Sequence, residues 1–322
     1  MKFSSSFASL SFALLASTLA MGASLAADAA PSGADAEQIQ TQTQTQTQAQ
    51  TASKALGLGG WIQRYQARVT ATQNQQPHWI TPLVTITPRL EQEFRTDFVH
   101  GYTPQGDALW NYDNGKGLEL IPFRRIELLF NAPPFQNHLA PKTNDGFGDL
   151  SFLGKFRIYA RNEQSGNAIV TAFLGGSIPT GKNGNGSCCA IVTPTLAMGK
   201  GWGLFDLTTT AAGTLPVTNS NGLGHTVIWN SVAQYQLAHS GWRRLFWPEL
   251  ETNANFFLGG ANDGKTTTYM TPGVLIGRVP LTHPANGKPG RLGLTFGAGE
   301  QIAVTRFHAL NHNLILTARI PF

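Results

Sequence analysis

Charged side chains are scarce in this 322-residue sequence. Only 13% of the residues are Asp, Glu, Lys or Arg, whereas an average soluble domain contains roughly 25%. The formal net charge of +5 is modest, and it is spread along the chain without a run of Lys and Arg. The composition therefore gives no sign of nucleic-acid binding. It favours a protein with a large surface that does not face water.

Long apolar runs are missing after residue 27. A transmembrane helix needs about 20 consecutive apolar residues, so no such helix is expected there, and a membrane-embedded chain would have to span as a barrel. The N-terminus differs, because Lys2 is followed by an apolar run over 12–19 and then by small residues. This layout is typical of a signal peptide over residues 1–26, cleaved after Ala26, and it predicts export.

Cysteine is nearly absent. The two cysteines, Cys188 and Cys189, are adjacent, and in an oxidising compartment they either form a vicinal disulfide or remain free thiols at a loop edge. Two cysteines without a clustered histidine indicate no metal site. His308 and His312 are four residues apart, but they lie at a strand junction, where this spacing does not place them on one helical face. No metal and no cofactor is expected.

The first part of the mature chain differs from the rest. Residues 27–56 are rich in Gln and Thr and have little to bury, which predicts a disordered linker. In residues 57–76, Trp61, Ile62, Tyr65 and Val69 recur at helical spacing before Pro77, which predicts a short amphipathic helix. The helix could pack on the end of a barrel, enter its mouth as a plug, or lie at the membrane interface. Simple packing is the first choice and a plug the second.

Residues 145–161 alternate so regularly that they determine how the remaining segments are interpreted. One parity is apolar: Leu150, Phe152, Gly154, Phe156, Ile158 and Ala160. The other carries Asp149, Ser151, Leu153, Lys155, Arg157, Tyr159 and Arg161. Because successive side chains of a strand point to opposite faces, this segment is a strand with one apolar and one charged face.

The same charged parity recurs in segments 85–99, 117–130, 243–259 and 311–322. Several charges on one strand face are costly in a dry core but reasonable in a watery lumen, so the apolar faces are expected to meet lipid. The pore-lining candidates are Arg89, Glu91, Glu93, Arg95, Asp97, Glu119, Arg125, Glu127, Asp149, Lys155, Arg157, Glu249, Glu251 and Arg319. Arg124 falls on the apolar parity and is expected near a rim or a register irregularity.

Residues 80–322 contain eleven such segments. Outer-membrane barrels nearly always have an even number of strands, and the region 109–112, inside a long loop, is the preferred place for a missed strand. We therefore predict an all-β fold: a closed antiparallel transmembrane β-barrel of twelve strands, with ten as the alternative.

The last strand carries a further signal. Leu314, Leu316, Ala318, Ile320 and the terminal Phe322 share one face, which resembles the sequence by which the outer-membrane assembly machinery recognises barrels. This strand is expected to pair with the first, because an open edge is untenable in lipid. The expected partners are outer-membrane lipid, the assembly machinery and a small-molecule solute.

Two short motifs resemble one family. The strand at 145–158, Asp-Gly-Phe-Gly-Asp-Leu-Ser-Phe-Leu-Gly-Lys-Phe-Arg-Ile, and Pro179-Thr180-Gly181 after the next strand resemble the outer-membrane transporter family of the phenol-degradation meta pathway. The resemblance covers about residues 80–322. It implies a barrel that passes small molecules, aromatic or otherwise hydrophobic ones among them, and it brings no catalytic residues.

Catalytic motifs give no support for an enzyme. The sequence has no Gly-x-Ser-x-Gly, no His-Glu-x-x-His and no phosphate-binding Gly-x-x-x-x-Gly-Lys-Ser/Thr. The carboxylate pairs Glu91/Glu93 and Glu249/Glu251 fit a mixed-charge wall better than an acid/base pair. The sequence therefore predicts an outer-membrane channel or facilitator. The alternative is a non-conducting barrel, either an envelope hydrolase or a structural or adhesion protein.

Overall fold

The computed structural model describes residues 57–114, 116–139, 143–218, 220–282 and 290–322. The predicted signal peptide and the predicted linker lie outside these residues. Within the described ranges, no helix has both the length and the apolar character needed to cross a membrane.

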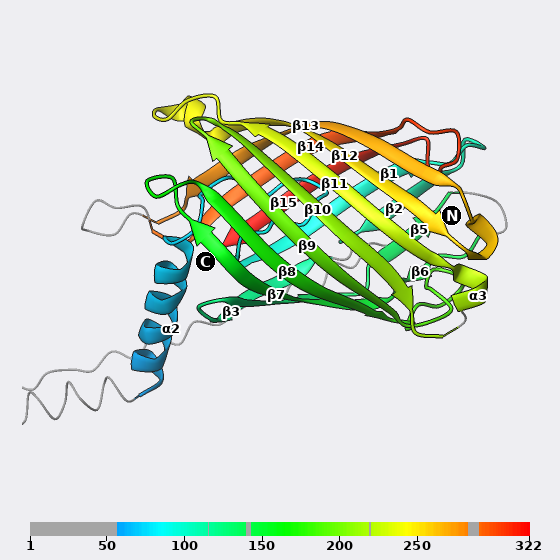
Figure 1. Ribbon diagram of the computed structural model, residues 1–322, viewed down its shortest axis with the longest axis horizontal. Coiled ribbons are helices and arrows are strands. Elements are labelled where there is room, and N and C mark those ends of the chain that lie inside the picture. Colours follow the sequence, from blue (N-terminus) through cyan, green and yellow to red (C-terminus); the bar gives the residue numbers. More distant parts are fainter. Residues whose placement is uncertain (1–56, 115, 140–142, 219, 283–289) are drawn as a thin grey trace, which may run out of the picture. The chain divides into compact units, whose positions relative to one another are not determined.

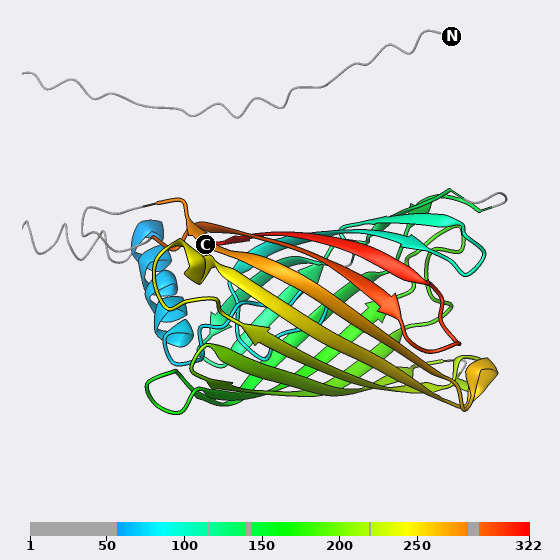
Figure 2. The ribbon, with the colours of Figure 1, turned by 90° about the horizontal axis from the view of Figure 1, so that it is seen from above.

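Twelve antiparallel strands form a closed barrel (Figures 1 and 2). They are β1 (Glu93–Tyr102), β3 (Gly117–Phe123), β4 (Ile126–Asn131), β7 (Leu150–Arg161), β8 (Ala168–Ile178), β9 (Ile191–Trp202), β10 (Phe205–Pro216), β11 (His225–Tyr235), β12 (Phe246–Leu258), β13 (Thr266–Pro280), β14 (Gly293–Ala303) and β15 (His312–Pro321). The ring closes because β15 pairs with β1, from Glu93 opposite Pro321 to Tyr102 opposite His312. The predicted pairing of the last strand with the first is thus confirmed, and the barrel wall has no open edge.

The missing twelfth strand is not the one that the sequence indicated. Ala108–Tyr112 does form a strand, β2, but it pairs only with the second half of β1, from Phe98 to Tyr102, and continues the sheet there with β5 (Phe135–His138) and β6 (Gly146–Phe147). The twelfth barrel strand arises because segment 117–130 is a hairpin of β3 and β4, joined by a turn at Arg124 and Arg125. Arg124 is therefore at a rim, as expected.

The barrel has two ends, which we call the terminal end and the far end. The terminal end carries the last residue of β15 and the β3–β4 turn. The far end carries the short helices α3 (Ser220–Leu223) and η2 (Gly260–Asn262), whereas η1 (Trp242–Leu245) lies between β11 and β12 at the terminal end.

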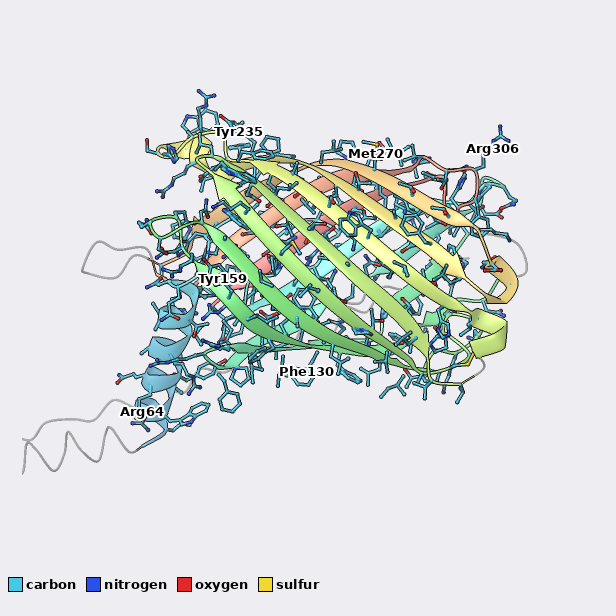
Figure 3. All side chains as sticks on the ribbon, in the orientation of Figure 1. Arg64, Phe130, Tyr159, Tyr235, Met270 and Arg306 are labelled. Atoms are coloured by element: carbon cyan, nitrogen blue, oxygen red, sulfur yellow. A yellow bond between two sulfur atoms is a disulfide. The ribbon has the colours of Figure 1, made fainter. Side chains whose placement is uncertain are left out.

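The outer face of the barrel is apolar. Figure 3 shows Phe130 and Met270 on the outside of the wall, between the two ends, and both side chains are exposed. Exposed aromatic residues form a girdle near the terminal end, at Phe123, Tyr159, Trp202, Tyr235 and Trp242, and others, such as Phe156 and Trp229, lie between the two ends. An apolar outer face with aromatic residues at a rim is typical of a barrel that sits in a bilayer.

One register shift alters the predicted alternation. Arg157 pairs with Thr171 and Tyr159 with Val170, so Ile158 is a bulge. Beyond it the faces are exchanged: Tyr159 is exposed, while Ala160 packs inward against the Trp79 cluster. Tyr159 thus belongs to the outer girdle and not to the charged face on which the sequence placed it.

Residues 77–92, which we call the plug segment, run inside the barrel without forming a helix or strand. Trp79 and Leu83 of this segment pack against Ile169, Trp247 and Leu275 of the wall. Leu83 lies where Cβ atoms on Gly273, Gly297 and Gly299 would stand, so these glycines make room for it. The strand predicted over 85–99 therefore begins only at Glu93.

The helix α2 (Leu58–Gln73) covers part of the terminal end through its residues 61–73. Val69 is fully buried against Leu90 and Ile121. Arg291 donates to the carbonyl oxygens of Gln66 and Phe322, at 2.9 and 3.2 Å. Packing on the barrel end, the first choice from the sequence, is confirmed, whereas the lumen is filled by the segment that follows the helix.

Candidate functional site in the barrel lumen

Two carboxylates of β12 hold the main-chain N–H groups of the plug segment. Glu249 accepts from the amide of Leu83 at 3.0 Å. Glu251 accepts from the amides of Val84 and Thr85, each at 2.7 Å. Such charge-assisted hydrogen bonds contribute about 1.5–3 kcal/mol each where they are shielded from water, so these two side chains are a strong anchor.

Two arginines on adjacent strands, three and four positions around the wall from β12, hold main-chain carbonyl groups of the same stretch. Arg319 of β15 donates to the carbonyl oxygens of Thr81 and Pro82. Arg95 of β1 donates to those of Pro82 and Leu83, and Asp97 fixes its guanidinium through contacts of 2.7 and 2.9 Å. The wall therefore binds residues 81–85 from both sides through the backbone, acids to N–H and arginines to C=O.

A second group of charges surrounds the end of the plug segment. Lys155 forms an ion pair of 2.8 Å with Glu127 and donates to the carbonyl oxygen of Arg89 at 3.2 Å. Glu127 also accepts from the amide of Glu91, whose carboxylate pairs with Arg89 at 3.2 Å. Ion pairs of the wall thus continue into hydrogen bonds with the plug segment.

Ten of the fourteen pore-lining candidates are buried on the inner face of barrel strands: Glu93, Arg95, Asp97, Glu119, Glu127, Lys155, Arg157, Glu249, Glu251 and Arg319. Two others, Arg89 and Glu91, lie inside the barrel but on the plug segment. The last two were misplaced. Arg125 is exposed in the β3–β4 turn, and Asp149 precedes β7 in the far-end loops.

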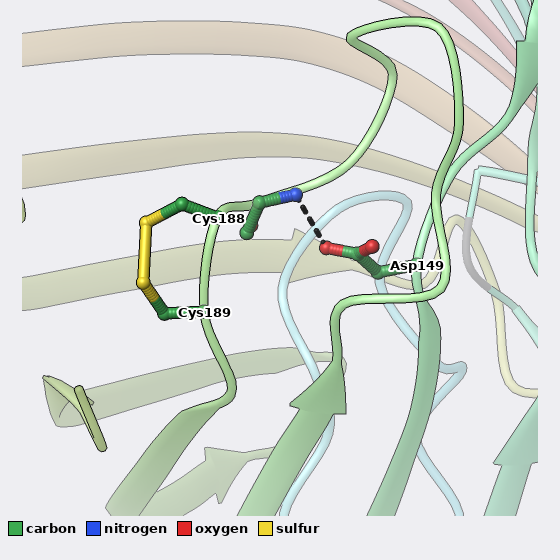
Figure 4. The surroundings of a disulfide bond; sticks show 4 residues. Asp149, Cys188 and Cys189 are labelled. Atoms are coloured by element: carbon green, nitrogen blue, oxygen red, sulfur yellow. Dashed lines mark hydrogen bonds between the residues drawn. A yellow bond between two sulfur atoms is a disulfide. The ribbon is translucent and has the colours of Figure 1, made fainter. Parts of the chain in front are cut away.

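Asp149 has a structural role in these loops. Its carboxylate accepts from the amides of Gly181 and Ser187, at 2.9 and 2.7 Å, and so closes the loop between β8 and β9. Figure 4 shows the second of these bonds beside the Cys188–Cys189 disulfide. Of the two states left open for the cysteines, the structure has the disulfide.

The sequence analysis missed the plug segment and several of its contacts. Pro77, Pro82 and Pro88 were the available signal, because proline is confined to edges, strand starts and bulges in sheets. The hydroxyl of Thr171 donates to the carbonyl oxygen of Pro88 at 2.5 Å, and Asn253 donates to the hydroxyl of Thr85 at 3.2 Å. Neither wall residue stood out by charge.

Three of the cavities among the described residues border the plug segment. Two of about 740 and 660 Å³ border His78 and Trp79 towards the terminal end. The third, of about 250 Å³, borders Ile86 and Thr87. In the described part of the chain, no group of three or more His, Cys, Asp or Glu residues is placed to hold a metal ion. His308 and His312 bond instead to neighbouring loop and strand groups.

His78 attaches the start of the plug segment to the β7–β8 loop. Its ring contacts Glu163 at 2.8 Å and its amide donates to the same carboxylate. Partial burial acts to raise the pKa of Glu163, but the hydrogen bonds from His78 outweigh it and lower this pKa to about 2.

A carboxyl group whose pKa falls on folding stabilises the folded state above its unfolded value, and the effect is lost as the pH drops towards the folded value. We therefore expect the His78–Glu163 contact to persist at pH 5 and to weaken progressively from about pH 4.5 towards pH 2. Hydrogen exchange of the His78 amide measures this. The variant Glu163→Gln should exchange faster already at pH 6, and an unchanged rate would contradict the assigned anchor.

The fold places the chain in the class of closed twelve-strand barrel proteins. Its exterior is apolar, and its charged lumen is occupied by the plug segment. No protein-family profile matches the sequence, and no curated protein is significantly similar to it. Among solved structures, the COG4313 outer membrane channel from Pseudomonas putida F1 is 15% identical. Its TM-score is 0.54, and the match covers 76% of this chain and all of that one.

A further solved structure, the NanC porin, is 10% identical with a TM-score of 0.44, covering 70% of this chain and 98% of that one. The similarity to the Pseudomonas putida channel supports the barrel fold.

Proposed function

We propose that this chain is an outer-membrane channel or facilitator for the passive passage of small molecules, closed in this state by the plug segment. The main observation that supports this proposal is that the buried charges of the wall bind main-chain groups of a separate segment inside the barrel. Eight-strand barrels are filled by their own side chains, whereas 16-strand barrels enclose a water channel. A barrel of twelve strands lies between them, and here a stretch of chain supplies the missing filling.

Several features support the membrane location and the orientation. The outer face is apolar with an aromatic girdle at the terminal end, and the fold is similar to that of an outer membrane channel. Outer-membrane barrels have short periplasmic turns and longer outer loops. The two-residue turns at Arg124–Arg125 and Gly203–Leu204 are at the terminal end, whereas the connection from β4 to β7 spans 132–149 at the far end. We therefore assign the terminal end to the periplasm.

The resemblance of two sequence motifs to transporters of the phenol meta pathway adds a substrate class to this proposal, namely small hydrophobic or aromatic molecules. Two indoles, Trp79 and Trp247, border both larger cavities and offer apolar surface for such a solute. The non-conducting alternatives, an envelope hydrolase or a structural protein, require neither a displaceable segment nor a route through the lumen.

Locking the plug segment tests this function. Thr85 and Asn253 are in hydrogen-bond contact, so the double variant Thr85→Cys/Asn253→Cys can be joined by a short bifunctional thiol reagent. We expect liposomes that contain the unjoined variant to admit small solutes faster than empty liposomes, and joining the cysteines to abolish this uptake. The measurement is solute-driven swelling.

A matched control places two cysteines on the wall only, at Thr209 and Ser231, whose side chains also meet. Joining these should leave uptake unchanged. If the unjoined Thr85→Cys/Asn253→Cys protein admits solute no faster than empty liposomes, the channel proposal is contradicted. If joining changes nothing, the plug segment is not the gate.

A further inference from the structure

One buried carboxylate in the lumen, that of Asp206, lacks a hydrogen-bond donor among the described residues. Asp206, the second residue of β10, faces the 660 Å³ cavity at the terminal end. It is 1% exposed, and neither of its carboxylate oxygens accepts a hydrogen bond from any described residue. Glu249 and Glu251, by contrast, bind plug amides. Since burying an unpaired carboxylate is costly, a ligand that donates hydrogen bonds to Asp206 would be favoured here.

Two further hydrogen-bond acceptors border this cavity. Asn167 is buried too, and its side-chain oxygen also has no donor among the described residues. Glu163 adds a second carboxylate. Of the nearby groups that can carry a positive charge, the His78 ring contacts Glu163 and the guanidinium of Arg89 pairs with Glu91 at 3.2 Å; His239 also borders the cavity.

Two indoles complete the cavity. Trp79 is 6% and Trp247 is 7% exposed. Trp79 lies on Gly199 and Gly201 of β9, where a Cβ atom would collide with the indole, and Gly201 is the cross-strand partner of Asp206. These glycines leave room for the ring beside the carboxylate. An organic ammonium ion binds to aromatic faces and donates hydrogen bonds to an acceptor beside them.

We propose that this cavity is a binding site for an organic ammonium ion, with Asp206 as its counter-ion and Trp79 and Trp247 as its aromatic walls. The ammonium group supplies the N–H donors that Asp206 and Asn167 lack. The inference goes beyond the proposed channel and does not depend on conduction, because binding to the folded protein in detergent is measured without a membrane.

Calorimetric titration of the detergent-solubilised protein with benzylammonium chloride tests the site. We expect saturable binding of one equivalent, with benzyl alcohol and benzoate each at least about tenfold weaker, because only the ammonium ion pairs with a desolvated carboxylate. The variant Asp206→Asn keeps the size of the side chain and should weaken benzylammonium binding at least about tenfold by the same reasoning.

The control variant is Asp107→Asn, which makes the same chemical change in the loop between β1 and β2 at the far end and should leave binding unaltered. Equal affinity for benzylammonium and benzyl alcohol would overturn the proposal on the native protein alone. So would the absence of saturable binding, or an unchanged affinity in Asp206→Asn; that last result would mean that Asp206 is buried in its neutral form.

Discussion

Replacing residues 78–89 by a two-glycine linker is expected to raise the conductance of the barrel in planar bilayers at least about tenfold, because a water-filled lumen replaces a packed one. The structure permits this short connection. The side-chain amide of Gln76 donates to the carbonyl oxygen of Leu90 at 2.8 Å and accepts from its N–H at 3.0 Å, so the two ends of the deleted stretch are already adjacent.

A milder variant separates loss of the plug segment from damage to the barrel. Glu249→Gln/Glu251→Gln removes the charges that bind the amides of residues 83–85 and keeps the size of both side chains. It should increase the fraction of time spent open, and Glu300→Gln, a carboxylate on β14 at the far end, should not. If the linker variant is folded in a heat-modifiability gel yet conducts no better than the native protein, the plug segment does not close the lumen.

Leu196→Arg is expected to destabilise the barrel by about 2–4 kcal/mol, the cost of a cation on the lipid face near the bilayer midplane. Leu196 is the sixth of the twelve residues of β9, and its side chain is 44% exposed on the outer face. Urea unfolding of the protein refolded into lipid vesicles measures the change in the free energy of unfolding.

The control is the same substitution at Leu258, the last residue of β12, which is 50% exposed. At a rim the cost should be only about 0–1 kcal/mol. Because the two sites have similar exposure and the same change, only their depth in the membrane differs. Equal destabilisation at both sites would mean that the outer face does not meet lipid.

The sequence was sufficient to assign residues to the inner face of the wall strands, but it was not sufficient to locate the plug segment. Alternation placed Glu93, Lys155 and Glu249 on the inner face correctly, because the period of a strand leaves only two faces to choose between. Arg89 and Glu91 continue the same alternation although their backbone is not a strand. The alternation therefore does not show where β1 begins. Here Pro82 and Pro88 were better guides than periodicity.

The predicted number of twelve strands is confirmed, but the expected position of the twelfth strand was wrong, for a related reason. Between β3 and β4, a register shift after Leu120 and a two-residue turn return the alternation to its original parity. The segment therefore looks like one strand of fourteen residues (117–130), with Arg124 as its irregularity. Asp206, which carries the ammonium proposal, sits in an otherwise Thr- and Ala-rich strand. The signal that could have marked it was a single carboxylate with no cation on the inward-facing parity of the neighbouring strands, since Lys200 of β9 pairs with Leu207 on the other face.

Both ends of the plug segment are at the same mouth of the barrel. Residue 77 follows the helix on the terminal end, and Glu93 starts β1 opposite Pro321 at that same end. The segment is therefore a re-entrant loop, and no chain end has to be threaded through the ring for it to enter or leave. When its main-chain hydrogen bonds to the wall break, the segment can leave the lumen as a unit while the pairing of β1 with β15 stays intact. The anchors of residues 81–85 bind backbone atoms, so these hydrogen bonds do not depend on the identity of the side chains there.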